Sequence, residues 1–530
     1  MEEQSGGNYV TRVLELFAGY GDTEAIVWSG RRVSYAELVR CTLALAAALG
    51  GRGLHPGATV AILVPDQPET AALQLALHLL GCRTAWIASY APRREQAAFI
   101  KLADPDAFVY HPAMIGGPGL IDELTHGEKP LRLFSFGAPM PGNPAAGDDL
   151  LTALERGWAG LPVSPQGPEP ESLFYSGGTT GTPKLIRHHQ AFYQNLLDIA
   201  DYYLSIGELP MRFLSGSSFS HVSGQLAGFL TLFEGGTLFQ SDDFSPAGFL
   251  AIVEHERISS AFLTPALLYA VADHPSTADT SSLRYLNVGG AAASPTRLAA
   301  AIERFGPVLR LVYGSSEAPL ITDFPFLDHD PDRPERLMSC GRPFLDMRIE
   351  IRDERGREQP VGEAGEVWVA GSLVMAGYWA PGQPGPDATG DGWIHTGDVG
   401  YLDEDGYLYL VDRTSDMIVT SEAAANVYCR PIEDALHSHP GVRAAAVAGV
   451  PDEACGEVVC AFVVTDPGAQ VSADDLRQHV RAQLNALYTP RRIEFVGELP
   501  LTGLAKVDKR ALRLAHLAGL AHSPAGSGAG

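Results

Sequence analysis

Short apolar runs that stop at turns rich in glycine, serine or threonine recur along this chain. Runs without polar alternation are typical of parallel strands buried on both faces, whose carboxyl-terminal loops carry functional residues. Between them lie helical patterns such as "SYAELVRCTLALAAALG" (34–50), which opens with a capping box of Ser34 and Glu37. The alternation predicts an α/β fold with mixed and parallel sheets flanked by helices. The apolar runs are "SLFYSGG" (172–178), "AFLTPALL" (261–268), "YLNVGGAA" (285–292) and "LRLVYGSSEA" (309–318).

The pattern changes near residue 400, where "TGDVGYLDEDGYLYLVDR" (396–413) carries strong turn signals. The elements expected after it are enough for a second domain of roughly 100 residues. We therefore expect a large domain over 1–412, a small mobile α+β domain over 413–516 and a flexible tail over 517–530. The small domain should contain strands around 443–450, 457–465 and 491–499 and a capped helix over 472–484.

Composition narrows the class of protein. A chain of 530 residues is too long for one ordinary core, and 45% apolar with 19% charged residues is typical of a soluble globular protein. A net charge of −25 is a poor match for a nucleic-acid-binding surface. The sequence has no signal-peptide pattern and no apolar run long enough for a membrane helix. We expect a cytoplasmic monomer or homodimer with neither nucleic acid nor membrane as a partner.

Cysteine and histidine spacing argues against structural cross-links. The six cysteines are scattered without Cys-x-x-Cys spacing, so neither a disulfide framework nor a zinc site is expected. The histidine pairs at 188–189 and 437–439 have no cysteine or carboxylate at ligand spacing, so no structural metal site is expected there.

The stretch "YSGGTTGTPKLIRHH" (175–189) has the chemistry of a polyphosphate loop. Its three glycines let backbone N–H groups turn inward, and its threonine hydroxyls add donors. It is not the common Gly-x-x-x-x-Gly-Lys-Ser/Thr loop, because Pro183 precedes Lys184 and no hydroxyl residue follows the lysine. By itself the stretch also fits a glycine/threonine hairpin with a solvated lysine.

Four further stretches follow this loop: "YGSSEA" (313–318), "TGD" (396–398), "VDRTSD" (411–416) and "LTGLAKVDKRAL" (501–512). In this order and spacing, and over essentially its whole length, the chain resembles the adenylate-forming superfamily of acyl- and aryl-CoA synthetases, stand-alone adenylation enzymes and luciferases. The loop "SGGTTGTPKLI" looks most like the branch that activates aromatic acids. The resemblance implies an N-terminal AMP-binding domain and a ligase that turns an acid and ATP into an enzyme-bound adenylate and pyrophosphate.

The same resemblance assigns residues to ATP and Mg²⁺. Glu317 and Thr180 would hold Mg²⁺, a hard cation that prefers oxygen ligands. Asp398 and Arg413 would bind the ribose. The remaining nucleotide contacts implied are Ser176, Gly177, Gly178, Thr179, Thr180, Gly181, Lys184, Gly290, Tyr313, Gly314, Ser315 and Ser316.

Lys506 matches the family's C-terminal catalytic lysine, which offsets the charge that builds up when a carboxylate attacks the α-phosphorus. The habitual glycine before it is Ala505 here. Ser415 matches the hinge between the two domains. For the acid pocket the resemblance implies the segment 217–228 with His221 and Gly224, and also Gly289 and Ala291. A core histidine is the alternative for His221. Residues 217–228 contain no Asp or Glu, which indicates an acid without an α-ammonium group.

The acceptor of the activated acid is left open by the sequence. Family members usually carry paired glycines in a loop that turns toward the thiol, whereas this chain reads "SDMIVTSEAAANVYC" (415–429). One prediction is transfer to CoA or to a carrier-protein thiol. The alternative is a diazotase that activates nitrous acid for an aromatic amine. A non-catalytic nucleotide-binding relative is a third reading, which the presence of Lys506, Glu317, Asp398 and Arg413 disfavours.

Overall fold

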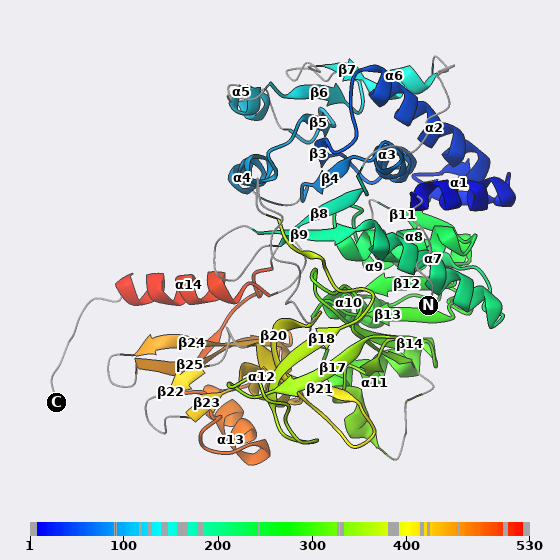
Figure 1. Cartoon of the computed structure of the whole chain (residues 1–530). Helices are drawn as coiled ribbons and strands as arrows, with labels where there is room; N and C mark the ends of the chain where they lie inside the picture. The colour runs from blue at the N-terminus through cyan, green and yellow to red at the C-terminus, as the bar shows by residue number, and fades with distance from the viewer. Residues whose placement is uncertain are drawn as a thin grey trace.

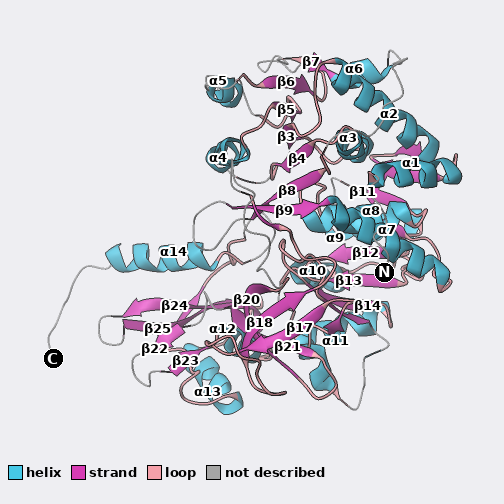
Figure 2. Cartoon of the chain, in the orientation of Figure 1, coloured by secondary structure: helices cyan, strands magenta, loops and turns pink. Residues whose placement is uncertain are grey.

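The computed structural model describes residues 8–89, 91, 93–115, 119–125, 130–138, 147–155, 168–176, 184–241, 244–291, 293–325, 328, 333–379, 392–413, 418–420, 425–452, 456–501 and 507–522. Helices and sheets alternate over these residues, which confirms the predicted α/β class (Figures 1 and 2).

The first large sheet has nine strands, and its central six run parallel. The edge strands β2 and β16, and β15 beside β16, pair antiparallel with their neighbours. In spatial order the strands are β16 (Arg342–Pro343), β15 (Thr322–Pro325), β14 (Leu309–Tyr313), β13 (Tyr285–Val288), β12 (Ser260–Leu263), β10 (Arg212–Ser215), β11 (Thr237–Gln240), β1 (Glu24–Trp28) and β2 (Arg31–Ser34).

The second large sheet has eight strands; six of them pair in parallel, and β9 pairs antiparallel with both β8 and β19. In Figure 1, helices α4 and α5 lie on one side of it and α2 and α3 on the other. The strand order is β19 (Gly377–Tyr378), β9 (Lys184–His189), β8 (Glu171–Ser176), β4 (Arg83–Trp86), β3 (Thr59–Leu63), β5 (Ala107–Tyr110), β6 (Arg132–Ser135) and β7 (Asp148–Asp149).

Helices cover both sheets, as expected for strands that are apolar on both faces. The predicted capping box is present: Ser34 and Glu37 exchange hydrogen bonds at the start of α2. The helices are α1 (Tyr9–Tyr20), α2 (Tyr35–Gly51), α3 (Pro68–Leu79), α4 (Arg93–Ala103), α5 (Gly119–Thr125), α6 (Leu150–Glu155), α7 (Gln190–Ser205), α8 (Val222–Phe233), α9 (Pro246–Glu256), α10 (Pro265–Asp273), α11 (Pro295–Phe305) and the 3₁₀ helix Pro334–Met338.

Helix α3 is buried along its whole length. Its two polar residues in the second half are therefore paired inside the core. Gln74 donates to the hydroxyls of Ser172 at 2.9 Å and Tyr193 at 3.0 Å, and Nδ1 of His78 lies 2.8 Å from the hydroxyl of Tyr9. Burial lowers the pKa of His78 to about 3. This network links helices α1, α3 and α7 to strand β8.

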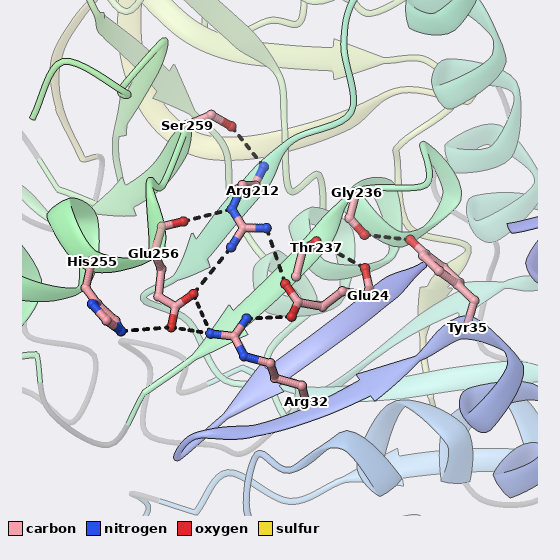
Figure 3. Close-up of polar contacts among 9 residues, drawn as sticks. All are labelled: Glu24, Arg32, Tyr35, Arg212, Gly236, Thr237, His255, Glu256 and Ser259. Atoms are coloured by element: carbon pink, nitrogen blue, oxygen red, sulfur yellow. Dashed lines mark hydrogen bonds and ion pairs between the residues drawn. The ribbon is translucent and has the colours of Figure 1, made fainter. Parts of the chain in front are cut away.

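Within the nine-stranded sheet, an ion-pair network joins the hairpin β1–β2 to strand β10 and to helix α9 (Figure 3). Arg32 on β2 contacts Glu24 at 2.5 Å and Glu256 at 2.6 Å, and Arg212 on β10 contacts the same two carboxylates at 3.2 and 3.3 Å. Each carboxylate is thus shared by two guanidinium groups. The network connects β1 and β2 with strand β10 and the end of α9.

A third, four-stranded antiparallel sheet precedes the C-terminal elements. It contains β17 (Arg348–Arg352), β18 (Gly365–Ala370), β20 (Ile394–Leu402) and β21 (Leu408–Arg413). The turn signals found in 396–413 mark the β20–β21 hairpin of this sheet.

Beyond residue 417, small sheets and helices build cores of their own, which include Val447, Phe462 and Leu476. The expected strands and capped helix are all present, with a capping box at Ser472. Helix α14 runs to His522 and so enters the stretch for which we expected a flexible tail. The elements are β22 (Ile418–Thr420), β23 (Ala425–Val427), α12 (Cys429–His437), β24 (Val442–Asp452), β25 (Gly456–Thr465), α13 (Ala473–Gln483), β26 (Arg492–Phe495) and α14 (Lys509–His522).

Candidate functional site

The expected site segments meet at one edge of the nine-stranded sheet. Strands β10, β12, β13 and β14 are parallel, so the segments after Ser215, Val288 and Tyr313 leave the sheet at the same edge. A ligand crevice is the usual feature of this edge in an α/β sheet. The acid-pocket segment, residues 289–291 and the motif 313–317 all follow these strands.

Asp398 forms a polar cluster with Tyr313 and Arg413 at this edge. Its Oδ2 accepts a hydrogen bond from the Tyr313 hydroxyl at 2.6 Å, and its Oδ1 lies 3.1 Å from Nε of Arg413. The carboxylate is buried, whereas Arg413 is half-exposed. Asp398 and Arg413 face each other in the β20–β21 ladder. Burial and the Asp398 carboxylate raise the pKa of Tyr313, which keeps its hydroxyl a donor. The two residues expected to bind ribose are thus brought together.

Glu317 is held by a residue that the sequence analysis did not single out. The hydroxyl of Tyr378 on β19 donates to Oε1 of Glu317 at 3.1 Å, and the backbone N–H of Met375 donates to the Glu317 carbonyl at 2.7 Å. The Lys184 ammonium lies over the Tyr378 ring, 4.7 Å from its centroid. The lysine that follows the phosphate loop and the carboxylate expected to hold Mg²⁺ therefore contact the same tyrosine.

His188 fixes the neighbouring residue of the same motif. Its side chain is buried, and Nε2 lies 3.0 Å from the carbonyl oxygen of Ser316, so this nitrogen carries the proton and donates. Its Nδ1 is buried and has no hydrogen-bond partner among the described residues. Burial lowers the pKa of His188 to about 4, so the ring is neutral.

The turn of the motif is tight. Ser315 N–H donates to the carbonyl of Ala318 at 2.9 Å, and a Cβ on Gly314 would lie 2.4 Å from the carbonyl oxygen of Pro319. Glycine is therefore required at 314 by the close approach of the backbone. The path of the chain from Tyr313 to Glu317 is set by these contacts.

The segment 217–228, which we expect to line the acid pocket, contains the start of helix α8. His221 is the N-cap residue, and its Nδ1 accepts a hydrogen bond from the backbone N–H of Ser223 at 3.3 Å. Gly224 packs directly against the carbonyl of Ser218, which leaves no room for a Cβ. Capping is the structural role that these contacts give His221, which is half-buried at this edge and does not lie in the core.

A carboxylate from elsewhere in the chain also reaches this segment. Oδ1 of Asp66 accepts hydrogen bonds from the backbone N–H of Phe219 at 2.9 Å and from the Ser218 hydroxyl at 3.1 Å. Nothing local in the sequence indicated this contact, because the partners are 153 residues apart. Through these two hydrogen bonds Asp66 stabilises the turn before α8.

Gly289, Gly290 and Ala291 follow β13 at the same edge. A Cβ on Gly289 would lie 2.6 Å from the carbonyl oxygen of Val312, so this glycine allows the two strands to approach closely. Gly290 has a φ of +84°, which favours glycine, and Ala291 is exposed. Both lie in the turn that precedes α11.

Several expected site residues lie outside the described residues: Gly177, Gly178, Thr179, Thr180, Gly181, Ser415 and Lys506. The backbone of Ser176 ends strand β8 and is paired with Lys184 on β9, so the expected phosphate loop stands between two antiparallel strands in the sequence. The side chain of Ser176 is not described either.

Two other features lie apart from this edge. A cavity of about 310 Å³ is lined by Tyr285 and Arg310, at the amino ends of β13 and β14, opposite the motifs. In the C-terminal region Cys460, Glu494 and His516 offer ligand atoms within 4.8 Å of one another. There, however, Arg492 contacts Nε2 of His516 at 3.1 Å, and Glu494 contacts Nδ1. Both ring nitrogens are already hydrogen-bonded, which argues against a metal ion there.

Comparison with known proteins identifies the family. Residues 15–379 match the family described as AMP-binding enzyme, and residues 431–506 match the AMP-binding enzyme C-terminal domain. The chain therefore belongs to this family of adenylate-forming ligases. None of the helices in the described part of the chain combines the length and hydropathy needed to cross a bilayer.

Three similar proteins have names that give different substrates or products. Medium/long-chain-fatty-acid–CoA ligase FadD8 of Mycobacterium tuberculosis is 41% identical over 359 residues, which cover 64% of this chain and only 60% of FadD8. Feruloyl-CoA synthase of Amycolatopsis sp is 32% identical, with 92% of this chain and 95% of the relative covered. The structure of amide bond synthetase McbA from Marinactinospora thermotolerans is 36% identical, with 96% and 99% covered and a TM-score of 0.83. These names lend no support to the diazotase alternative.

Proposed function

We propose that this protein uses Mg²⁺ and ATP to activate a carboxylic acid that has no α-ammonium group. A carboxylate oxygen would attack the α-phosphorus, the bond from that phosphorus to the bridging oxygen would break, and pyrophosphate would leave with the bonding electrons. The observation that carries the proposal is the cluster of Asp398, Tyr313 and Arg413 beside the motif that ends in Glu317. A buried carboxylate suits the two ribose hydroxyls of ATP, because it can accept a hydrogen bond from each.

Glu317 fits a magnesium ligand. It offers carboxylate oxygen, which Mg²⁺ prefers, and one of its oxygens is already oriented by Tyr378. Bound Mg²⁺ would neutralise charge on the phosphates. Lys184 supplies a cation on the first strand after the phosphate loop, and Lys506 is our proposed catalytic cation. Thr180 is the second magnesium ligand we propose.

An aromatic acid is the substrate class that we favour. The amino-acid sequence of the phosphate loop and the similarity to feruloyl-CoA synthase support an aromatic acid. Segment 217–228 carries no acidic residue, and the carboxylate of Asp66 that reaches it is engaged by the backbone of residue 219. An α-ammonium group would therefore lack its usual partner there.

We infer that the acceptor is an amine, so that the product is an amide. Two observations support this: the likeness to an amide bond synthetase over 96% of the chain, and the absence of glycine from residues 421–424, where the family carries its paired glycines. The second candidate is the thiol of CoA or of a carrier protein. The names of FadD8 and feruloyl-CoA synthase favour it.

Pyrophosphate release from Mg·ATP, measured with a panel of aryl and short aliphatic acids, tests the first half-reaction. Lys506→Ala should slow it by about 10²-fold or more. Unchanged release in that variant would contradict the role of Lys506. The second half-reaction is tested by mass spectrometry of the products formed from the best acid with an aromatic amine or with CoA. An amide formed without CoA supports the amine acceptor, and a CoA thioester formed in preference to the amide overturns it.

A further inference from the structure

Tyr378 occupies an unusual position, because one side chain contacts two opposite charges of the candidate site. Its hydroxyl donates to Glu317 at 3.1 Å, and its ring lies under the ammonium of Lys184 at 4.7 Å. Both charged residues are among the described residues, and no direct ion pair within 4.0 Å is found between them. The hydroxyl of Tyr378 therefore contacts the carboxylate and its ring contacts the ammonium, whereas these two charged groups form no ion pair with each other.

The backbone around Tyr378 is fixed on both sides by strand β9. Tyr378 is paired with Ile186, the N–H of Ala376 donates to the carbonyl of Arg187 at 2.7 Å, and the N–H of Trp379 donates to the carbonyl of Leu185 at 2.8 Å. Strand β9 starts at Lys184, directly after the phosphate loop. Tyr378 is thus tied rigidly to the strand that carries the lysine.

Glu317 is tied to the same short segment. The N–H of Met375, three residues before Tyr378, donates to the Glu317 carbonyl at 2.7 Å. The carboxylate is therefore anchored through its backbone and through its Oε1. A carboxylate can accept about four hydrogen bonds, so a donor at Oε1 leaves oxygen lone pairs for a cation.

We propose that Tyr378 is a positioning residue for Mg·ATP. Its hydroxyl orients the Glu317 carboxylate toward Mg²⁺, and its ring holds Lys184 at a distance where the ammonium faces the phosphates and does not neutralise the carboxylate. The inference rests on the proposed function, in which Glu317 binds Mg²⁺. Mg²⁺ demands near-ideal octahedral geometry, so a carboxylate free to rotate would bind it less well.

The test compares Tyr378→Phe, which removes only the hydroxyl, with Tyr378→Leu, which also removes the ring. A hydrogen bond to a charged group is worth enough that Tyr378→Phe should weaken binding of a non-hydrolysable ATP analogue about tenfold at low Mg²⁺. The deficit should shrink as Mg²⁺ is raised. Tyr378→Leu should weaken binding about threefold more, because the contact between the ring and Lys184 is also lost. Calorimetric titration at several Mg²⁺ concentrations measures both effects without turnover.

Tyr409→Phe is the matched control. Its hydroxyl lies 3.3 Å from the carboxylate of Asp403, a similar tyrosine–carboxylate contact away from the motif, and its loss should leave analogue binding unchanged. Analogue affinity and Mg²⁺ dependence that are unaltered in Tyr378→Phe would overturn the inference. Glu317→Gln distinguishes a failure of the proposed role of Glu317 from a failure of the inference about Tyr378. If it leaves the Mg²⁺ dependence unchanged, the proposed role of Glu317 is wrong. If it abolishes the Mg²⁺ dependence while Tyr378→Phe binds normally, only the inference about Tyr378 fails.

Discussion

Replacing His188 by leucine should separate the stability of the fold from the placement of Ser316. The change removes the hydrogen bond from Nε2 to the Ser316 carbonyl at 3.0 Å, worth about 1 kcal/mol. It also removes Nδ1, buried without a partner among the described residues, whose desolvation costs about 1–3 kcal/mol. The two effects oppose each other. At pH 8 we expect the free energy of unfolding to stay within about 1 kcal/mol of the wild type.

The pH dependence of the free energy of unfolding gives a more specific expected value. Burial lowers the pKa of His188 in the folded protein to about 4, from 6.5 in an unfolded chain. A histidine with a lowered folded pKa is protonated first in the unfolded state, so its contribution to stability is lost as the pH falls from 6.5 toward 4. At pH 5 this loss amounts to about 2 kcal/mol. Leucine does not titrate, so the variant does not suffer this loss. The free energy of unfolding of the variant minus that of the wild type should therefore be about 2 kcal/mol larger at pH 5 than at pH 8.

Urea unfolding at the two pH values measures the stability difference, and steady-state kinetics at pH 8 measures use of ATP. Because Ser316 loses its anchor, kcat/KM for ATP should fall about tenfold. His274→Leu is the control, since it also removes a buried Nδ1 without a partner in the described part of the chain but lies at the end of α10. A stability loss above about 2 kcal/mol at pH 8 together with unchanged ATP kinetics would refute the reasoning.

Three further substitutions test the site and the fold. Asp398→Asn replaces one of the two acceptor oxygens by an amide donor, which must face either Tyr313 or Arg413, both of them donors. The change should raise KM for ATP about tenfold or more, and an unchanged KM would contradict the placement of Asp398 against ATP. Gly289→Ala places a Cβ 2.6 Å from the Val312 carbonyl oxygen and should cost about 1–3 kcal/mol, seen as a lower melting temperature, whereas Gly19→Ala, with nothing within 4 Å, should not destabilise. Ser34→Ala removes the capping box of α2 and should cost about 1 kcal/mol in urea unfolding; no loss would show that the cap is dispensable.

The predicted elements that depend on neighbouring residues alone agree with the structure. The apolar runs at 172, 261, 285 and 309 became strands β8, β12, β13 and β14, because a short run of branched and aromatic residues ending at a turn favours a buried strand wherever it lies. The cap at Ser34 formed for the same reason, since both of its partners lie within one turn of helix.

The contacts that the sequence analysis missed join distant parts of the chain. Tyr378 and Glu317 are 61 residues apart, His188 and Ser316 are 128 apart, and Asp66 lies 153 residues from Phe219. Tyr378, His188 and Asp66 each fit an unremarkable local pattern. Their partners are set by which strands become neighbours, and no periodicity in a window of sequence carries that information.

The sequence by itself determined the class of fold, the order of the motifs and the kinds of groups that ATP chemistry needs, because composition and local pattern suffice for these. Only the tertiary structure decided how those groups are held. Pairing of β19 with β9 places Tyr378 between Lys184 and Glu317, and pairing of β20 with β21 places Asp398 against Arg413. The physical reason is that hydrogen-bond geometry and burial depend on strand register, and register is settled by packing of the whole chain.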